Sequence, residues 1–375
     1  MKVLIFLTYG VSLRDWAESG LLTRELELYK IISKKYNLDF TIISYGNSED
    51  EKFLIEVDKI SVIPIYKYIK KSKYKLMNFT KTLYVPFLLR FKLKIRFDLI
   101  KTNQLWGSWV AIMLKAITFK PLHIRTGYDI FKFSIDEKKL LYKRIFYYFL
   151  TQTGLIFSNL YSVTSKSDLD YIKKYYLFSN SKLALRPNWV QVDKKFPKGT
   201  RNNKILMVGR LEKQKNFDFI IEKLKNTNLF LDIYGDGSLL EELKLKAKNI
   251  ENIKFMGKVE HSELMDIYKK YSIYLSVSDY EGNSKTILEA MGSGCVVIAN
   301  TIPNNTEIIE NDINGILFDK EKDNIIEILK NVLYEPIKFE IISKQAYQKI
   351  ANNNSLISCS SREYKDYLHM LNLKY

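Results

Sequence analysis

Residues 273–299 read IYLSV-SDYEGNS-KTILEAM-GSG-CVVIA. The first and last blocks, Ile273–Val277 and Cys295–Ala299, are short apolar runs of the kind that form buried parallel strands. The block between them, Lys285–Met291, spaces its apolar side chains as a helix does. A strand, a helix and a second strand make a βαβ unit, and successive units build a parallel sheet. This segment therefore predicts an α/β fold.

The same alternation continues on both sides of this unit. In the second half, the sequence predicts strands over Lys204–Val208, Leu229–Tyr234, Ile253–Met256 and Ile316–Phe318, and helices over Asn216–Leu224, Ser238–Lys248 and Ser262–Tyr271. In the first half, it predicts a helix over Trp16–Lys35 and strands over Lys2–Leu7, Phe40–Ser44, Leu99–Thr102, Leu122–Thr126 and Leu160–Thr164. This pattern predicts doubly wound α/β domains with parallel sheets, in which ligands bind at the carboxyl ends of the strands.

The length of 375 residues and the apolar fraction of 46% fit two domains of ordinary size. The segment 187–201 contains Pro187, Pro197 and Gly199 and predicts the hinge between them. We expect three parts, which are a Rossmann-like domain over 1–195, a second over 200–340, and helices over 341–375 that pack back toward the first domain.

Cysteine and histidine content argues against a disulfide framework and a zinc site. The two cysteines, Cys295 and Cys359, lie far apart, and the three histidines show no metal-ligand spacing. The apolar run after Lys2 is short for a signal peptide, and the uncharged segment 145–165 contains too many polar residues for a membrane span. We therefore expect a cytoplasmic protein that holds no metal or other cofactor.

Positive charge is concentrated in the first half. Residues 1–198 hold 35 Lys/Arg and 17 Asp/Glu, whereas residues 199–375 hold 24 and 25. From Lys59 to Phe97 there are eleven Lys/Arg, no Asp/Glu and eight interleaved aromatic residues. This mixture of residues has three interpretations. It can bind an anionic membrane interface, it can bind single-stranded nucleic acid, or it can form a solvated face over a core. Composition alone leaves the three interpretations open.

A first chemical pattern follows the strand predicted over Lys204–Val208. Gly209 allows a tight turn, which brings Arg210 and Lys215 within reach of the strand ends. Two cations at this place suit a diphosphate, whose negative charge grows as a glycosidic bond breaks. The alternative is solvated charge at the start of a helix.

A second pattern, Gly235-Asp-Gly237, follows the strand that ends at Tyr234. The two glycines permit the close approach of a ligand. The alternative is a local role, in which Ser238 and Glu241 form a capping box for the next helix.

The third pattern joins the strand Ile273–Val277 to the helix Lys285–Met291. Glu281 lies in the loop, and Glu289 lies eight residues further on, inside the helix. Amide groups at the helix start can bind a phosphate, and the loop carboxylate can hold sugar hydroxyls or a developing positive charge at an anomeric carbon. The alternatives are an ion pair of Glu289 with Lys285 and a solvated Glu281. The residues expected to bind the donor here, with Asn283 or Ser284 as the helix cap, are Gly282, Asn283, Ser284, Lys285 and Thr286.

A fourth pattern, Thr301–Glu307, predicts a loop and helix start, and Asn314-Gly315 predicts a turn. The order of the four patterns resembles the C-terminal domain of family 4 retaining glycosyltransferases (glycosyl transferases group 1). The similarity runs from about Pro187 to about Phe318, and its most specific part is Glu281–Gly294.

The resemblance implies the GT-B fold, with two facing Rossmann-like domains and the ligand cleft between them. It implies that Arg210 and Lys215 hold the donor diphosphate, and that Gly209, Gly235 and Gly237 line the donor site. It also implies that Glu281 contacts the donor sugar and Glu289 the ribose.

The sequence departs from the family pattern at several places. Ser284 stands where members usually carry proline, and Pro303-Asn304 stand where many carry a Gly-Gly pair, although Glu307 matches. Many members place a histidine after a late strand of the first domain, but His123 falls inside the predicted strand, as core histidines do. The remaining candidates for acceptor or cleft contacts in the first domain are Gly10, Ser12, Arg125 and Asp129.

We therefore expect a retaining glycosyltransferase that moves a sugar from a UDP- or GDP-linked donor without a metal. The expected acceptor is a lipid-linked glycan in cell-surface polysaccharide or glycolipid synthesis, at the inner face of the membrane, and nucleic acid is not an expected partner. Two alternatives on the same fold are a nucleotide-sugar epimerase and a phosphorylase. A basic nucleic-acid-binding protein is the alternative from another class, and it leaves the second-half patterns unexplained.

Overall fold

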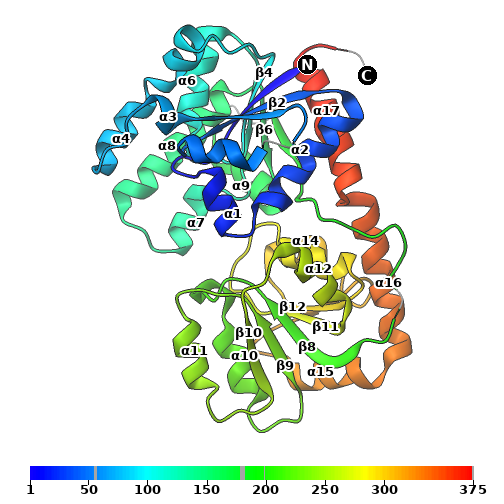
Figure 1. The fold of residues 1–375 in the computed structure, drawn as a ribbon. Helices are drawn as coiled ribbons and strands as arrows, with labels where there is room; N and C mark the ends of the chain where they lie inside the picture. Colours follow the sequence, from blue (N-terminus) through cyan, green and yellow to red (C-terminus); the bar gives the residue numbers. More distant parts are fainter. Residues whose placement is uncertain (55–56, 178–181, 198, 374–375) are drawn as a thin grey trace. The chain divides into compact units, whose positions relative to one another are not determined.

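The computed structural model describes residues 1–54, 57–177, 182–197 and 199–373. The chain folds into two compact units. Unit 1 comprises Met1–Arg186 together with Ser360–Tyr375, and unit 2 comprises Pro187–Cys359. Both ends of the chain therefore belong to unit 1 (Figure 1).

Within its described residues, unit 1 contains a sheet of seven parallel strands in the order β3-β2-β1-β4-β5-β6-β7. The strands are β1 (Lys2–Phe6), β2 (Asp39–Ser44), β3 (Ile60–Pro64), β4 (Leu99–Thr102), β5 (Leu122–Arg125), β6 (Leu160–Val163) and β7 (Leu183–Leu185). The central strands are buried, and the sequence of β1 is accordingly apolar after Lys2, whereas β4 and β5 also bury Lys101 and His123.

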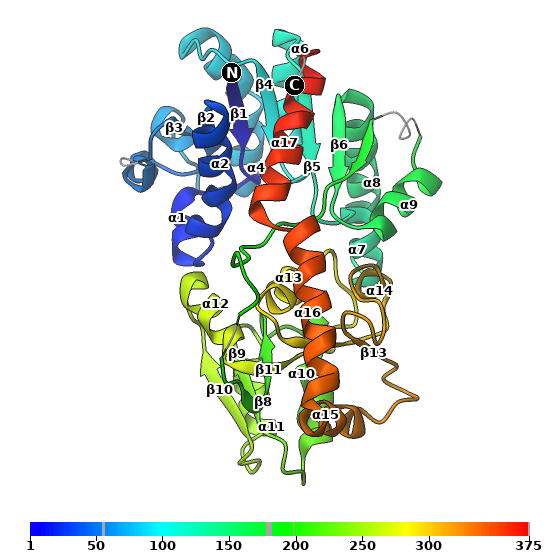
Figure 2. The ribbon, with the colours of Figure 1, turned by 90° about the vertical axis from the view of Figure 1, so that its right-hand side faces the viewer.

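Helices cover both faces of this sheet. They are α1 (Leu13–Glu18), α2 (Leu22–Tyr36), η1 (Ser48–Leu54), α3 (Ile65–Tyr68), α4 (Lys75–Thr82), α5 (Val85–Phe87), η2 (Leu88–Lys92), α6 (Ser108–Thr118), α7 (Ile130–Asp136), α8 (Leu141–Phe157), α9 (Lys166–Tyr175) and α17 (Leu356–Met370). On β4, Ile100 packs in the core with Val110 of α6, whereas the next residue, Lys101, contacts Glu363 of α17. Because successive side chains of a strand point to opposite faces, α6 and α17 cover opposite sides of the sheet (Figure 2).

The contact between β4 and α17 is a buried ion pair. Lys101 is fully buried and bonds Glu363, which also accepts a hydrogen bond from Tyr367. Burial alone would raise the pKa of Glu363, but the neighbouring Lys101 holds it below its ordinary value. Nearby, Arg186 donates to both carboxylate oxygens of Asp366 at 2.6 Å each. The last helix is thus fastened to unit 1 by charge as well as by packing.

Over the part that the structure describes, unit 2 has a six-stranded parallel sheet in the order β10-β9-β8-β11-β12-β13. Its strands are β8 (Asn202–Val208), β9 (Leu231–Tyr234), β10 (Ile253–Gly257), β11 (Tyr271–Ser276), β12 (Val296–Asn300) and β13 (Ile316–Phe318). Its helices are η3 (Lys213–Lys215), α10 (Phe217–Leu224), α11 (Leu240–Lys246), α12 (His261–Lys269), α13 (Lys285–Gly292), α14 (Pro303–Ile308), α15 (Ile325–Tyr334) and α16 (Pro336–Asn353).

The two parallel sheets with their helices confirm the predicted α/β class, and three local expectations differ. The helix expected over Trp16–Lys35 is two helices, α1 and α2, because Gly20 adopts a positive φ of 72° between them. Strands β3 and β7 were not predicted. Both are short edge strands of the sheet, and β3 lies inside the basic segment, where the surrounding charges hide its apolar run.

Candidate functional site

The carboxyl edge of the sheet of unit 2 has one place where the strand order reverses. Strands β8 and β11 are neighbours, but the chain continues from β8 to β9 on one side and from β11 to β12 on the other. Open parallel sheets bind ligands at such a reversal, outside the carboxyl ends of the strands. The loops that follow β8 and β11 contain the first and third sequence patterns, so the fold brings these patterns to the expected place.

The loop after β8 is tied to the loop after β11 by side chains. Gln214 Nε2 donates to the carbonyl of Tyr280 at 2.7 Å, and the adjacent Lys215 forms an ion pair with Glu281. Ser278 Oγ donates to Glu281 Oε1 at 2.7 Å. The side chains of Lys215 and Glu281 are 17% and 9% exposed. A cation and a carboxylate that were singled out separately thus meet in a shielded position that remains open to solvent.

The glycines of the second pattern, Gly235 and Gly237, allow the loop after β9 to pack against the loop after β8. A Cβ atom on Gly235 would lie 1.9 Å from the carbonyl oxygen of Gly209, and one on Gly237 would lie 2.5 Å from that of Leu211. The close approach is therefore between backbone segments that follow β8 and β9. It places Arg210, whose side chain is exposed, at the same edge of the sheet.

The alternative interpretation of the second pattern, a capping box of Ser238 and Glu241, is wrong. The amide and hydroxyl of Ser238 donate to the carboxylate of Glu212 at 3.1 and 2.7 Å, and α11 begins only at Leu240. Ser238 instead binds the loop after β8, because the two glycines before it bring the loops into contact.

Helix α13 begins directly after the loop that contains Glu281. Its cap residue, Ser284, makes no side-chain capping bond, and its hydroxyl lies 3.2 Å from that of Thr286. Asn283 is bonded to Asn188, whose amide donates to Asn283 Oδ1 at 2.8 Å and whose side chain donates to the Asn283 carbonyl at 2.7 Å. The expected side-chain cap is therefore wrong. Because the side chain of Ser284 does not cap the helix, it leaves the first amide groups of α13 available to a phosphate.

Glu289 lies two turns into α13 and is 2% exposed. Its Oε1 lies 3.0 Å from His261 Nε2, and its Oε2 accepts a hydrogen bond from Tyr268 Oη at 3.3 Å. Lys285, the alternative partner, instead places its ammonium 5.0 Å from the centre of the Trp189 ring. Both partners of Glu289 come from α12, and the sequence analysis missed them. The available signal was the apolar sequence around Glu289, because a buried carboxylate needs hydrogen-bonding partners.

The loop after β12 is joined to the same region. Asn300 Nδ2 donates to the carbonyl of Ser278 at 2.8 Å, and Asn305 Nδ2 donates to that of Asn300 at 2.9 Å. Asn304, which stands where many family members have glycine, is 6% exposed. At the predicted turn, Asn314 Oδ1 accepts a hydrogen bond from the amide of Glu310 at 3.0 Å.

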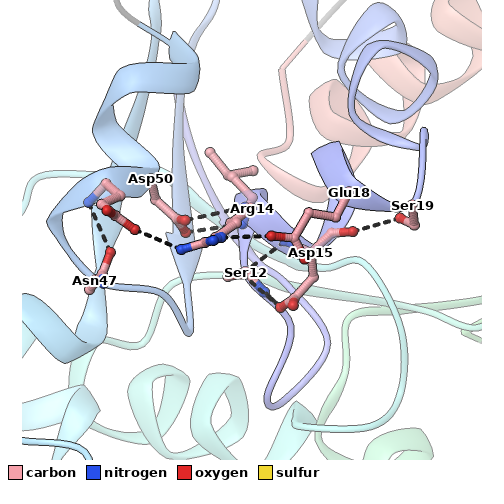
Figure 3. Close-up of polar contacts among 9 residues, drawn as sticks. Ser12, Arg14, Asp15, Glu18, Ser19, Asn47 and Asp50 are labelled. Atoms are coloured by element: carbon pink, nitrogen blue, oxygen red, sulfur yellow. Dashed lines mark hydrogen bonds and ion pairs between the residues drawn. The ribbon is translucent and has the colours of Figure 1, made fainter.

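In unit 1, the corresponding helix start after β1 is already occupied by side chains. Ser12 caps α1 in a capping box with Asp15, whose amide donates to Ser12 Oγ at 3.0 Å. Figure 3 shows Asp50 reaching the same helix start, where it accepts from the amides of Leu13 at 3.0 Å and Arg14 at 3.2 Å. Ser12 is therefore engaged by its own helix.

The other candidates of unit 1 are spread along the same sheet edge. Gly10 is exposed, with φ at 84°, and Arg125 is half-buried at the end of β5. Asp129 is fully buried and caps α7 by accepting from the amide of Lys132, and burial raises its pKa to about 6. His123 is 1% exposed inside β5, which confirms it as a core residue.

The basic segment Lys59–Phe97 is a folded part of unit 1 that contains β3, α3, α4, α5 and η2. Its exposed cations include Lys70, Lys71, Lys73, Lys75, Arg90, Lys92, Lys94 and Arg96. No helix in the described residues is both long enough and apolar enough to cross a membrane. Over the same residues, no group of three or more His, Cys, Asp or Glu is placed to hold a metal ion.

Known proteins are similar to this chain both in the segment that contains the candidate site and over most of its length. Residues 191–349 match the family model of Glycosyl transferases group 1. The UDP-N-acetylglucosamine--peptide N-acetylglucosaminyltransferase GtfA subunit of Streptococcus agalactiae is 38% identical over 126 residues, which are 31% of this chain and 24% of that protein. In three streptococcal relatives of this name, the match spans between 24% and 38% of the relative's own length. The UDP-Gal:alpha-D-GlcNAc-diphosphoundecaprenol alpha-1,3-galactosyltransferase of Escherichia coli is 25% identical over 325 residues, which cover 80% of this chain and 76% of that protein.

The fold has solved counterparts over its whole length. Sucrose-phosphate synthase from Thermosynechococcus elongatus superposes with a TM-score of 0.81 over 99% of both chains, at 13% identity. At this identity the likeness shows the fold alone. The chain has the GT-B fold, and its residues 191–349 are similar to the glycosyl transferases group 1 domain.

Proposed function

We propose that this protein is a retaining glycosyltransferase of family 4 that binds a nucleotide-diphosphate sugar in unit 2. The observation that supports this most directly is the contact between Lys215 and Glu281 at the reversal of the strand order. The contact lies inside the segment that matches the glycosyl transferases group 1 model. Lys215 and Glu281 are 66 residues apart in the sequence, and the fold alone brings them together.

The diphosphate is held by Arg210, Lys215 and the start of α13. Negative charge grows on the leaving diphosphate as its bond to the anomeric carbon breaks, and preorganised cations and amide groups stabilise that charge. Lys215 exchanges Glu281 for the phosphate when the donor binds, and Glu281 then contacts the sugar hydroxyls. Because two cations serve the diphosphate, turnover needs no divalent metal.

The nucleoside is held further along α13. Glu289 accepts hydrogen bonds from the ribose hydroxyls, which carboxylates bind well because they offer about four acceptor positions. His261 and Tyr268 each contact a different oxygen of Glu289 and so fix the orientation of the carboxylate. Gly209, Gly235 and Gly237 keep the two neighbouring loops close enough to shape this edge.

The donor is a UDP- or GDP-linked sugar, and UDP is favoured because the two relatives described above are named for UDP-linked donors. The acceptor is a lipid-linked glycan of cell-surface polysaccharide or glycolipid synthesis, since the Escherichia coli relative is named for a diphosphoundecaprenol-linked acceptor. Gly10 and Arg125 of unit 1 are the acceptor-side candidates, whereas Ser12 and Asp129 support helix starts. The exposed cations of the basic segment hold the protein to the inner face of the membrane.

The test is a panel of UDP- and GDP-sugars, each incubated with the protein in the presence and absence of a lipid-linked acceptor, with and without a chelator. We expect one donor to be consumed, faster with acceptor, with unchanged rate in chelator and with retained anomeric configuration by NMR. A rate that a chelator abolishes and manganese restores overturns the metal-independent assignment.

The same panel separates the alternatives. Conversion of the donor without an acceptor to an isomeric sugar indicates an epimerase, and dependence on free phosphate indicates a phosphorylase. If no donor is consumed and single-stranded nucleic acid binds with a steep salt dependence, the glycosyltransferase proposal is wrong.

A further inference from the structure

Helix α8 presents an apolar face to solvent that nothing in unit 1 covers. Leu141 and Tyr142 are 70% and 65% exposed, and Ile145, Phe146 and Phe149 are 49%, 42% and 61% exposed. These positions repeat at intervals of three and four residues, so they line one side of the helix. The opposite side of α8 is buried, at Leu150 and Leu155 for example. The helix is thus apolar on both sides.

Helix α8 itself carries only positive charge, and the exposed acids nearest to it in the sequence, Asp136 and Glu137, lie before its start. From Lys138 to Ser167 the sequence holds five Lys/Arg and no Asp/Glu. Lys138 and Lys143 are exposed at the start of α8. A helix with exposed aromatic and aliphatic side chains, bordered by cations and free of acids, fits the boundary between anionic headgroups and acyl chains.

The face of α8 continues toward the basic segment through a series of aromatic contacts. The ring of Phe146 on α8 lies 6.0 Å from that of Trp106, Trp106 lies 5.5 Å from Trp109 on α6, and Trp109 lies 5.1 Å from Phe79 on α4. Figure 1 shows α4, α6 and α8 grouped on one side of unit 1. Helix α4 and its flanks expose further apolar side chains, which include Tyr74, Leu76, Met77 and Phe87.

This surface can face solvent, bind another protein or bind a membrane. Contiguous exposed apolar patches mark interaction sites in soluble proteins, so solvent alone does not explain it. Lysine is depleted at protein interfaces, whereas exposed lysines border the present surface at the start of α8 and in the basic segment. Charge complementarity therefore favours an anionic bilayer.

We propose that α8 is the membrane-docking helix of this protein, and that its exposed face inserts into the headgroup region of an anionic bilayer. The proposal rests on the membrane association proposed above and extends it from the basic segment to one defined helix. The basic segment supplies attraction that salt screens, and α8 supplies apolar insertion that salt does not weaken.

The first test is flotation with vesicles of anionic and of neutral lipid, at low and high salt, using Ile145→Ser combined with Phe149→Ser. Phe230→Ser, which changes an exposed aromatic residue of unit 2, is the matched control, since Phe230 is 48% exposed. We expect the double variant to bind anionic vesicles at least about tenfold more weakly than wild type, because each side chain loses its transfer into the interface. The control binds like wild type, and circular dichroism verifies that the variants are folded.

A second measurement reads insertion directly. Phe149→Cys is labelled with a polarity-sensitive dye, which is selective because Cys295 and Cys359 are buried. We expect a blue shift with anionic vesicles and no shift for the labelled Phe230→Cys control. If wild type floats while the double variant floats equally and the dye shows no shift, the role of α8 is wrong and the basic segment acts alone.

Other outcomes separate this proposal from the enzymatic one. Wild type that ignores anionic vesicles at low salt overturns both the α8 proposal and membrane association. A vesicle-independent dimer that the double variant dissolves overturns the proposal in favour of a protein interface. Vesicle binding by a protein that consumes no nucleotide-sugar supports α8 and contradicts the proposed enzymatic function.

Discussion

In unit 1 the strand order runs β3-β2-β1-β4, and in unit 2 it runs β10-β9-β8-β11, so both sheets reverse beside their first strand. The two reversal points differ in the side chains that lie at the start of the adjacent helix. At α1, the carboxylate of Asp50 accepts from two backbone amides. At α13, Ser284 provides no side-chain cap, and Lys215 and Glu281 lie in the adjoining loops. A helix start that already holds a carboxylate has no room for a phosphate, which supports the anion site that we propose in unit 2.

The charged pairs of the two units differ in the same way. The two carboxylates are buried to a similar degree, but the lysines differ, because the side chain of Lys101 in unit 1 is 0% exposed whereas that of Lys215, at the sheet edge of unit 2, is 17% exposed. We therefore expect charge changes in unit 1 to alter stability and charge changes in unit 2 to alter turnover. The predictions below test this division.

The largest effect is expected for Lys101→Met. It leaves Glu363 buried without its cation, and breaking such a pair costs about 3–5 kcal/mol of unfolding free energy. Urea denaturation measures the loss, and Lys67→Met, which removes a surface pair with Glu51, serves as the control with little change. The double variant Lys101→Met with Glu363→Leu should recover most of the stability. An unchanged midpoint for the single variant contradicts the structural role of the pair.

Lys215→Ala, Arg210→Ala and Glu281→Gln are expected to fold normally and to lose about 10²–10³-fold in turnover. Removing one group that stabilises developing charge costs about 2–4 kcal/mol at the transition state. Initial rates with the correct donor measure the effect. Lys213→Ala changes an exposed cation of the same loop and is the matched control. Near-normal rates in all three variants would remove the donor site from this edge.

Asp50→Ala tests the occupied helix start of unit 1. It removes the acceptor for two amides of α1 and for the hydroxyl of Ser44, and lost helix caps cost about 1–2 kcal/mol. The unfolding free energy should fall by this amount, while donor consumption per folded molecule stays the same. Glu49→Ala, the exposed neighbour, is the control. A loss of turnover without a loss of stability would show that this helix start also serves the reaction.

His261→Ala and Glu289→Gln should raise the apparent donor constant by about tenfold, equivalent to about 1.4 kcal/mol, with a smaller change in kcat. Both disturb the carboxylate that we propose binds the ribose, away from the bond that breaks. His261→Gln keeps a hydrogen-bond donor and should restore part of the affinity. Equal losses of kcat in these variants and in Glu281→Gln would erase the distinction between ribose and sugar contacts.

The smallest effect concerns pH. Burial raises the pKa of Asp129 to about 6, above its ordinary value of 3.8, so between these values the folded protein binds more protons than the unfolded chain. Stability therefore falls as pH rises through this window. Asp129→Asn has no buried carboxyl group to ionise. Its unfolding free energy should therefore rise by on the order of 1 kcal/mol relative to that of wild type between pH 4 and pH 7. Thermal unfolding of both proteins at a series of pH values measures the difference in stability. A difference that does not change with pH contradicts the raised pKa of Asp129.

The local sequence determined the strands and the places of the motifs. Leu99–Thr102 and Ile316–Phe318 form strands with the predicted bounds, because short segments that begin with apolar residues between polar connections favour buried parallel strands. Glu281 and Lys215 were found by their position after such strands. Parallel strands end at one sheet edge, so this placement followed from the order of elements alone.

Tertiary structure alone decided which of these residues touch. The pairing of Lys101 with Glu363 joins residues 262 positions apart, and the pairing of Glu289 with His261 depends on the packing of α12 beside α13. It also decided that Asp50 accepts hydrogen bonds from the start of α1, whereas the side chain of Ser284 does not cap α13. Periodicity and turn chemistry act between neighbours in the chain, whereas these contacts depend on how separate segments pack. For that reason no local pattern could have revealed them.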